Sequence, residues 1–238
     1  MPEKHAVEQM FDNIAPEYDA LNHLLSLDID KWWRHLAVRQ AADRHKSQNI
    51  LDVACGTGDF SIALARYASK SSVIGVDLSE GMMQKGREKV MKAGLSGSIR
   101  MIKGDCEALE FADSSFDAVC AGFGVRNFEH LEQGLREMLR VLRPGGKLVI
   151  LELSVPRTPV LKFLYKIYFT KILPSIGGHY SGNKSAYKYL PASVLRFPLP
   201  KEFKEILRSC GYSDIRHRAL TFGICRLYTA VKPKYDKY

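Results

Sequence analysis

The chain has 238 residues, of which 46% are hydrophobic and 26% are charged. This composition is typical of one sizeable globular domain and excludes disordered, collagen-like and fibrous proteins. No apolar run approaches the roughly 18 residues of a membrane span, and residues 1–10 lack the hydrophobic stretch of a signal peptide. Five cysteines without the paired spacing of a zinc site predict reduced thiols in a cytoplasmic protein.

The net charge of +9 is concentrated in one part of the chain. Residues 1–150 carry 19 Lys and Arg against 21 Asp and Glu, whereas residues 151–238 carry 16 against 5. A basic surface confined to the last third suits anionic lipid headgroups as well as phosphates. A solvated basic face without any partner explains the charge equally well.

The first predicted elements form a βαβ unit. The apolar run Asn49–Val53 predicts a buried strand, and the apolar spacing over Asp59–Tyr67 predicts a helix. The glycine turn Ala54–Gly58 joins them. A second buried strand is predicted at Ser72–Asp77, and Ser79 can cap the helix that follows it.

The alternation of strands and helices continues along the chain. Strands are predicted at Ser98–Ile102, Phe116–Ala121 and Gly146–Glu152, with a helix at Leu131–Leu142 and a turn at Arg143–Gly146. Regular alternation with nearly continuous apolar strands indicates an α/β fold, in which helices cover both faces of a mostly parallel sheet.

The C-terminal part breaks this alternation. Helical spacing over Pro200–Cys210 is followed by two predicted strands, Ser213–Leu220 and Ile224–Val231. Because only a few residues separate these strands, they predict an antiparallel hairpin at the sheet edge.

The residues around the glycine turn favour a sulfonium nucleoside over a dinucleotide. Asp52 would repel a pyrophosphate, and Ser61 stands where dinucleotide-binding turns have a third Gly or Ala. Gly56 and Gly58 let the backbone approach a ligand closely, and Asp77 can accept hydrogen bonds from two ribose hydroxyls. A tight turn without a ligand is the simpler alternative.

Two residues after the third predicted strand strengthen the nucleoside interpretation. Asp105 is placed to hold an adenine amino group, and the Cys106 amide can contact the ring edge. Because these loops all follow the carboxyl ends of strands, they meet where open α/β sheets bind ligands. We therefore expect S-adenosylmethionine as the cofactor. No metal is expected, because no cluster of His, Cys, Asp and Glu has ligand spacing.

The cofactor core resembles the class I S-adenosylmethionine-dependent methyltransferases, a Rossmann-like fold whose seven-stranded sheet has its last strand antiparallel. Beyond this core, four further segments resemble the ubiquinone/menaquinone biosynthesis C-methyltransferase family. These segments are Met10–Asn22, Gly122–Asn127, Tyr187–Pro198 and Leu220–Ile224, so that the resemblance covers nearly the whole chain.

The family resemblance implies methyl transfer from the sulfonium to a ring carbon of a reduced, prenylated quinol. We expect demethylmenaquinol in menaquinone biosynthesis, with a benzoquinol of ubiquinone biosynthesis as the alternative. Cofactor contacts are implied at Thr57, Asp77, Asp105 and Cys106. Some members have Ser where this chain has Gly122, so a side-chain contact is absent there.

A quinol carbon becomes nucleophilic when a neighbouring hydroxyl loses its proton, and a phenol with a pKa of about 10 is mostly protonated at neutral pH. Arg126 follows the fourth predicted strand and is the first candidate to stabilise the quinolate. An ion pair with Glu129 is the alternative. Asn127 is expected to hydrogen-bond the second quinol oxygen, to cap the next helix, or both.

Three further residues are candidates for the reaction. Tyr18 and Asp19 belong to an N-terminal segment that is expected to fold over the site, although Phe11 and Ile14 nearby read as an ordinary amphipathic stripe. His130 lies close to Arg126 in the sequence and is a candidate general base, or a surface histidine.

The run Val160–Leu173 predicts a basic amphipathic helix, with Lys162, Lys166 and Lys171 along one side. Such a helix can lie in the interface of an anionic membrane, from which a prenylated quinol would be collected. A helix that covers the pocket or makes a homodimer contact is the alternative.

Three other functions are alternatives to this one. They are methylation of another small molecule, RNA modification by the basic last third, and cofactor binding without catalysis. No RNA-binding motif is visible, and no nucleic acid partner is expected.

The chain is expected to form a single domain, 1–238, with four parts. These are an N-terminal helical lid (1–45), a cofactor-binding core (46–152), an insertion facing substrate and membrane (153–200), and a C-terminal helix and hairpin (201–238).

Overall fold

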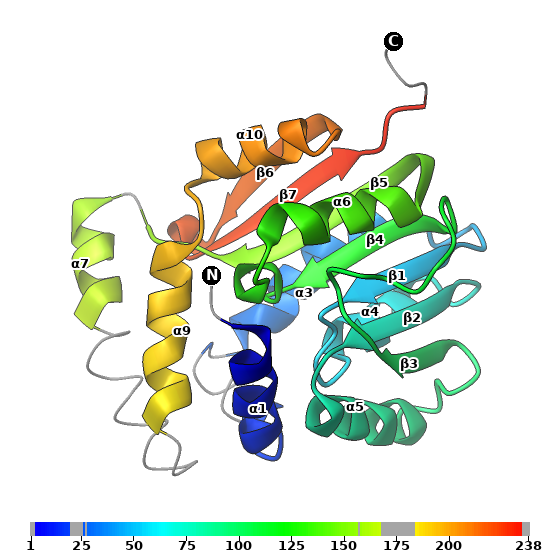
Figure 1. Ribbon diagram of the computed structural model, residues 1–238, viewed down its shortest axis with the longest axis horizontal. Coiled ribbons are helices and arrows are strands. Elements are labelled where there is room, and N and C mark those ends of the chain that lie inside the picture. The colour runs from blue at the N-terminus through cyan, green and yellow to red at the C-terminus, as the bar shows by residue number, and fades with distance from the viewer. Residues whose placement is uncertain (1–2, 20–25, 27, 157, 168–183, 235–238) are drawn as a thin grey trace.

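The computed structural model describes residues 3–19, 26, 28–156, 158–167 and 184–234 (Figure 1). Its centre is a seven-stranded sheet, whose strands are β1 (Asn49–Val53), β2 (Ser72–Asp77), β3 (Ile99–Lys103), β4 (Phe116–Gly122), β5 (Leu142–Leu153), β6 (Ser213–Leu220) and β7 (Cys225–Val231). The spatial order is β3-β2-β1-β4-β5-β7-β6. The first five strands are parallel, and β7 is antiparallel to both β5 and β6. This confirms the predicted sheet and its C-terminal hairpin.

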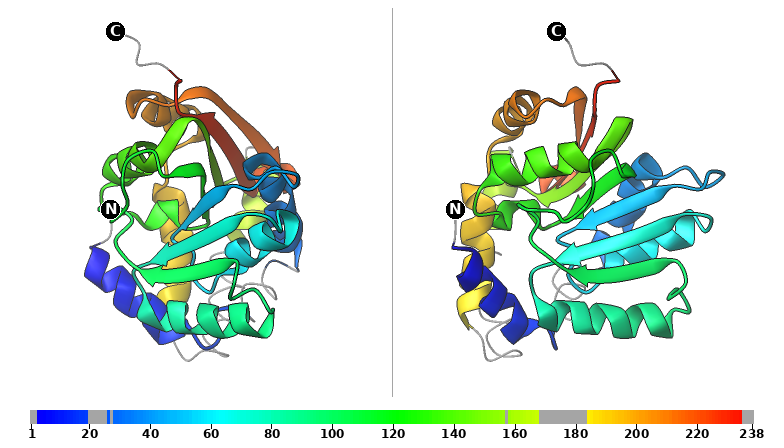
Figure 2. Two further views of the ribbon diagram at one scale, coloured as in Figure 1. Left: turned by 90° about the vertical axis from the view of Figure 1, so that its right-hand side faces the viewer. Right: turned by 45° about the vertical axis from the view of Figure 1, so that its right-hand side comes forward.

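Helices cover both faces of the sheet, as the sequence predicts (Figure 2). The described helices are α1 (Lys4–Ile14), α3 (Ile29–Ala41), α4 (Asp59–Tyr67), α5 (Glu80–Lys92), α6 (Leu131–Val141), α7 (Pro159–Ile167), α9 (Lys184–Arg196) and α10 (Pro200–Ser209), with 3-10 turns η1 (Val125–Asn127) and η3 (Thr221–Gly223). Apolar residues of α3, α4 and α5 form a core on one face, and those of α6 and α10 form a core on the other. All five cysteines are buried and free.

Local signals explain where two of the helices, α5 and α10, begin. Ser79 caps α5, because its side chain accepts a hydrogen bond from the Met82 amide at 3.1 Å. In α10, Pro200 occupies the first turn, and Glu202 reaches back to the Leu199 amide at 2.9 Å. These helices begin where the sequence predicts.

The turn predicted at Arg143–Gly146 differs from the structure, because it lies inside β5. Leu142 already pairs with Phe116, and the next pair is Ala118 with Lys147, so residues 143–146 bulge out of the ladder. Gly145, at φ +80°, supplies the conformation that this bulge needs. The preceding helix therefore ends at Val141, one residue earlier than predicted.

The segment after β5 leaves the sheet and lies beyond the carboxyl ends of the parallel strands. Here α9 stands next to α1, and α7 lies on the far side of α9 (Figure 1). The predicted basic helix Val160–Leu173 is present as α7 up to Ile167, and Lys171 lies outside the described residues. Within the described part of the chain, no helix is long and apolar enough to cross a membrane.

Candidate active site

A cleft of about 690 Å³, open to solvent, lies at the carboxyl ends of the parallel strands. The segments that follow β1, β2, β3 and β4 line it on one side, and α1 and Tyr18 line it on the other. This is where open α/β sheets bind ligands. Of the predicted site residues, seven line this cleft: Tyr18, Gly56, Asp77, Asp105, Cys106, Gly122 and Asn127.

The glycine turn after β1 is held by Asp77 at the end of β2. One carboxylate oxygen of Asp77 accepts from the Gly56 amide at 2.8 Å, and the other accepts from the Ser79 amide at 3.0 Å. Burial raises the pKa of Asp77, whereas these hydrogen bonds oppose the shift. Gly56 and Gly58 have φ of +54° and +81°, a backbone region that favours glycine.

Asp52 lies beneath this turn and does not line the cleft. Its side chain is fully buried, and Oδ2 accepts a hydrogen bond from Ser61 Oγ at 2.6 Å. Its Oδ1 has no hydrogen-bond partner among the described residues. Burial raises the pKa of Asp52 to about 7, and the bond from Ser61 limits the rise.

Ion pairs and hydrogen bonds hold α1 over the cleft. Lys4 Nζ lies 2.6 Å from Asp105 Oδ2 and 3.4 Å from Glu107 Oε2. Further along α1, Asp12 Oδ1 accepts hydrogen bonds from Ser79 Oγ at 2.5 Å and from the Gly81 amide at 2.9 Å. The helix is therefore fastened to the segments that follow β2 and β3, and Lys4 contacts the carboxylate predicted to hold an adenine.

The predicted residues Tyr18 and Asp19 have different surroundings. Tyr18 packs edge-on against Phe11, with ring centroids 6.0 Å apart, and both line the cleft. Asp19 does not line it; its carboxylate contacts Thr57 Oγ1 and Lys89 Nζ, each at 2.5 Å. Asp19 thus fastens the N-terminal segment to the glycine turn.

Arg126 is buried and forms an ion pair with Glu152 of β5, with Nη1 and Oε1 2.9 Å apart. Its backbone amide also donates to Glu152, at 3.1 Å, and Nη1 donates to the Phe123 carbonyl. Burial alone would lower the pKa of Arg126, but Glu152 raises it overall. The alternative pairing with Glu129 is wrong, because Glu129 instead accepts from the Lys4 amide. Arg126 itself does not line the cleft.

Asn127 lines the cleft, and its Oδ1 accepts a hydrogen bond from the Tyr189 hydroxyl at 3.0 Å. It does not cap the following helix, because α6 starts four residues later, at Leu131, with His130 at its N-cap position. The His130 side chain is 62% exposed, with Nδ1 3.0 Å from Glu107 Oε2, and it does not line the cleft.

The residues that hold Arg126 and Asn127 in place are not among those predicted from the sequence. Glu152 is a charged residue within the apolar run of β5, which signals a buried partner but not its identity. Ser193 Oγ accepts from Arg126 Nε at 3.3 Å, and Tyr189 contacts Asn127. Both lie on α9, a helix that the sequence reading did not predict.

The chain matches the ubiE/COQ5 methyltransferase family over residues 1–232. It belongs to this family. Gly122–Asn127 is one of the segments that resemble this family. Four of its residues line the cleft of this ubiE/COQ5 methyltransferase: Gly122, Phe123, Gly124 and Asn127.

Curated relatives of this ubiE/COQ5 methyltransferase match it over most of its length and over most of their own. The demethylmenaquinone methyltransferase of Bacteroides fragilis is 50% identical over 95% of this chain and 92% of its own length. The ubiquinone/menaquinone biosynthesis C-methyltransferase UbiE of Geobacter sulfurreducens is 48% identical over 95% and 88%. The demethylmenaquinone methyltransferase of Deinococcus radiodurans is 45% identical over 95% and 92%.

Solved structures share the fold at lower identity. The cyclase SpnF has a TM-score of 0.72 at 18% identity, covering 98% of this chain and 97% of its own. A S-adenosylmethionine-dependent methyltransferase of Thermotoga maritima, titled a possible histamine N-methyltransferase, has a TM-score of 0.67 at 20% identity, covering 94% and 99%. The fold is therefore that of these enzymes, and it hosts more than one reaction.

Gly124 is required by a close approach between two turns of the site. A Cβ atom at Gly124 would lie 2.4 Å from the Ala54 Cβ, and both residues line the cleft. We expect Gly124→Ala to lower the free energy of unfolding by about 1–3 kcal/mol, as overpacked cores do. Urea denaturation measures this loss. Gly97→Ala is the matched control, because nothing lies within 4 Å of its Cβ position; equal unfolding free energies for the two variants would refute the prediction.

Proposed function

We propose that this methyltransferase methylates a ring carbon of a reduced, prenylated quinol, with demethylmenaquinol as the acceptor. The observation that carries the proposal is the name of its relatives, demethylmenaquinone methyltransferase at 50% and 45% identity over 95% of the chain. The benzoquinol of ubiquinone biosynthesis is the second candidate, because other relatives carry the ubiquinone/menaquinone name at 48% identity.

The residues at the strand ends fit S-adenosylmethionine. Gly56 lines the cleft, and nothing lies within 4 Å of its Cβ position, so the glycine turn leaves room for a ligand. Asp77 is the last residue of β2, Asp105 and Cys106 follow the neighbouring strand β3, and all three line the same cleft. We propose that Asp77 binds the ribose and that Asp105 and Cys106 bind the adenine. When bound, the cofactor supplies the electrophilic methyl group.

Asn127 and Tyr18 are the proposed acceptor-binding residues, because both line the cleft beside the proposed cofactor site. A hydrogen bond donated to the quinol oxygen favours its ionised form and makes the adjacent carbon nucleophilic. Arg126, which does not line the cleft, is proposed to stabilise the same anion through its charge and without direct contact. Because Glu152 already neutralises its charge, this effect is weaker than that of an unpaired cation.

The remaining candidates do not line the cleft, and other roles are proposed for some of them. We propose that Asp52 fixes the first turn of α4 through Ser61 and that Asp19 holds Thr57. We propose that α1 and Tyr18 act as a lid, because they form one wall of the cleft. The predicted lid 1–45 is too long, since α3 packs its apolar residues into the core beside the sheet. His130 is left without a proposed role, because it is exposed and its ring contacts Glu107 outside the cleft.

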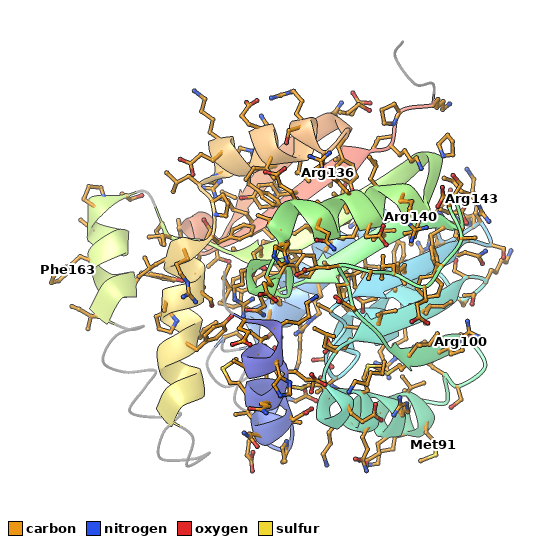
Figure 3. The ribbon with its side chains drawn as sticks, in the orientation of Figure 1. Met91, Arg100, Arg136, Arg140, Arg143 and Phe163 are labelled. Carbon is orange, nitrogen blue, oxygen red and sulfur yellow. The ribbon has the colours of Figure 1, made fainter. Side chains whose placement is uncertain are left out.

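A peripheral contact with an anionic membrane is proposed for α7. Val160 and Phe163 on this helix are 68% and 64% exposed, and Phe163 points away from the rest of the protein (Figure 3). Residues 151–238 carry 16 basic against 5 acidic residues, which suits anionic headgroups. Flotation with anionic vesicles but not with neutral vesicles would support this contact; equal flotation, or none, would contradict it.

Methyl transfer from labelled S-adenosylmethionine tests the proposed function directly. We expect label in the product with chemically reduced demethylmenaquinone in liposomes and none with the oxidised quinone, because only the quinol can form the nucleophilic anion. Transfer to a prenylated benzoquinol alone would change the acceptor. A protein that binds the cofactor but methylates no prenylated quinol would contradict the proposal.

A further inference from the structure

Helix α9 contacts both candidate residues that follow β4. The Tyr189 hydroxyl donates to Asn127 Oδ1 at 3.0 Å, and Ser193 Oγ accepts from Arg126 Nε at 3.3 Å. Tyr189 and Ser193 are four residues apart, so they lie one turn apart on the same face of the helix. One face of α9 is thereby bonded to two consecutive residues of η1.

Tyr189 acts on Asn127 as a hydrogen-bond donor. Burial raises the pKa of its hydroxyl, and nearby Arg126 and Arg196 oppose the shift, while Glu152 adds to it. The hydroxyl therefore keeps its proton at neutral pH. The bond from Tyr189 to the Asn127 carbonyl oxygen fixes the orientation of the amide, and the NH2 group, which has no hydrogen bond to a described residue, can donate to a ligand.

We propose that Tyr189 is a positioning residue, which orients the Asn127 amide so that its NH2 group donates to an oxygen of the acceptor. This inference rests on the proposed function and adds a chemical requirement to it. The molecule that receives the methyl group must place an atom that accepts a hydrogen bond beside the Asn127 NH2 group. An ionised quinol oxygen is the strongest such atom of the substrate. Without Tyr189, the amide is free to rotate by half a turn and to offer its carbonyl oxygen instead.

A simpler role for Tyr189 is to fix α9 against the sheet. The two roles differ in what a second substitution does. If Tyr189 acts only through Asn127, its hydroxyl has nothing left to do once the Asn127 amide is removed. If it fixes α9, its removal costs the same in either background.

The test is a double-mutant cycle with Tyr189→Phe and Asn127→Ala, assayed with labelled cofactor and reduced demethylmenaquinone. We expect Tyr189→Phe to lower kcat about tenfold, the effect of one hydrogen bond, and to leave the KM for S-adenosylmethionine unchanged. In the Asn127→Ala background, the same substitution should change kcat less than about twofold. Tyr212→Phe is the matched control, because its hydroxyl donates to the Leu135 carbonyl at 3.0 Å inside the core; its kcat should equal that of the parent.

Two results would overturn this role while leaving the proposed function intact. One is a kcat of the Tyr189→Phe variant equal to that of the parent. The other is a loss of kcat from Tyr189→Phe that is the same in the parent and in the Asn127→Ala variant. A parent that methylates no prenylated quinol would overturn the proposed function and, with it, the role of Tyr189. Activity of the parent is therefore measured first, so that the two failures are told apart.

Discussion

Replacing Arg126 with alanine is expected to lower the free energy of unfolding by about 3–5 kcal/mol, because the substitution leaves a buried carboxylate without its cation. Glu152 is fully buried, and Arg126 is 5% exposed. The remaining partners of Glu152 are the backbone amides of residue 126 and of Leu153, at 3.1 and 2.9 Å. Urea denaturation of the parent and the variant at pH 7.5 measures the loss.

A second substitution separates the ion pair from packing. Arg126→Met keeps much of the apolar volume, and adding Glu152→Gln removes the unpaired charge, so the double variant should recover about half or more of the lost stability. If Arg126→Ala unfolds at the same urea concentration as the parent, the pair does not stabilise the fold. Methyl transfer by the double variant then reports the catalytic effect of Arg126 with a smaller stability loss.

Replacing Asp52 with asparagine is expected to stabilise the protein above neutral pH. Burial raises the pKa of Asp52 to about 7, whereas an unfolded aspartate has a pKa of about 4. Between these values the folded protein binds one more proton than the unfolded chain, so its stability falls as the pH rises. The full effect is about 4 kcal/mol, reached above pH 7 and absent in the variant.

Urea denaturation at pH 5 and pH 8 detects this difference. The stability advantage of Asp52→Asn over the parent should grow by about 2–3 kcal/mol between the two pH values. Asp113→Asn is the control, because the Asp113 side chain is 75% exposed. An advantage of Asp52→Asn that is the same at both pH values would show that the Asp52 carboxylate does not titrate in this range.

The strands, turns and helices of the cofactor-binding core could be predicted from the sequence, because the signals for them are local. The apolar run Asn49–Val53, the glycines after it and the cap at Ser79 each act within a few residues, and the structure has them where expected. The position of Asp77 could be predicted in the same way. It ends β2, and its contact is with the glycine turn that follows the neighbouring strand β1.

The contacts of the candidate catalytic residues could not be predicted, because they join distant segments. Arg126 finds Glu152 only through the pairing of β4 with β5. Whether Arg126 pairs with Glu129 or with Glu152 depends on which carboxylate is buried beside it. The sequence separation of three residues between Arg126 and Glu129 does not reveal this. The contact of Lys4 with Asp105 depends on how α1 lies over the cleft. Sequence spacing carries no information on that placement.

The strand order β5-β7-β6 bears on how the chain folds while it is being synthesised. Seven residue pairs, from Lys147–Val231 to Leu153–Cys225, join β5 to β7. Until residues 225–231 have left the ribosome, the apolar strand β5 has an open edge on which another nascent chain can pair. β6 leaves the ribosome earlier than β7 and cannot dock, because its neighbour in the sheet is β7. The last strand to be made is therefore the one on which both of its neighbours depend.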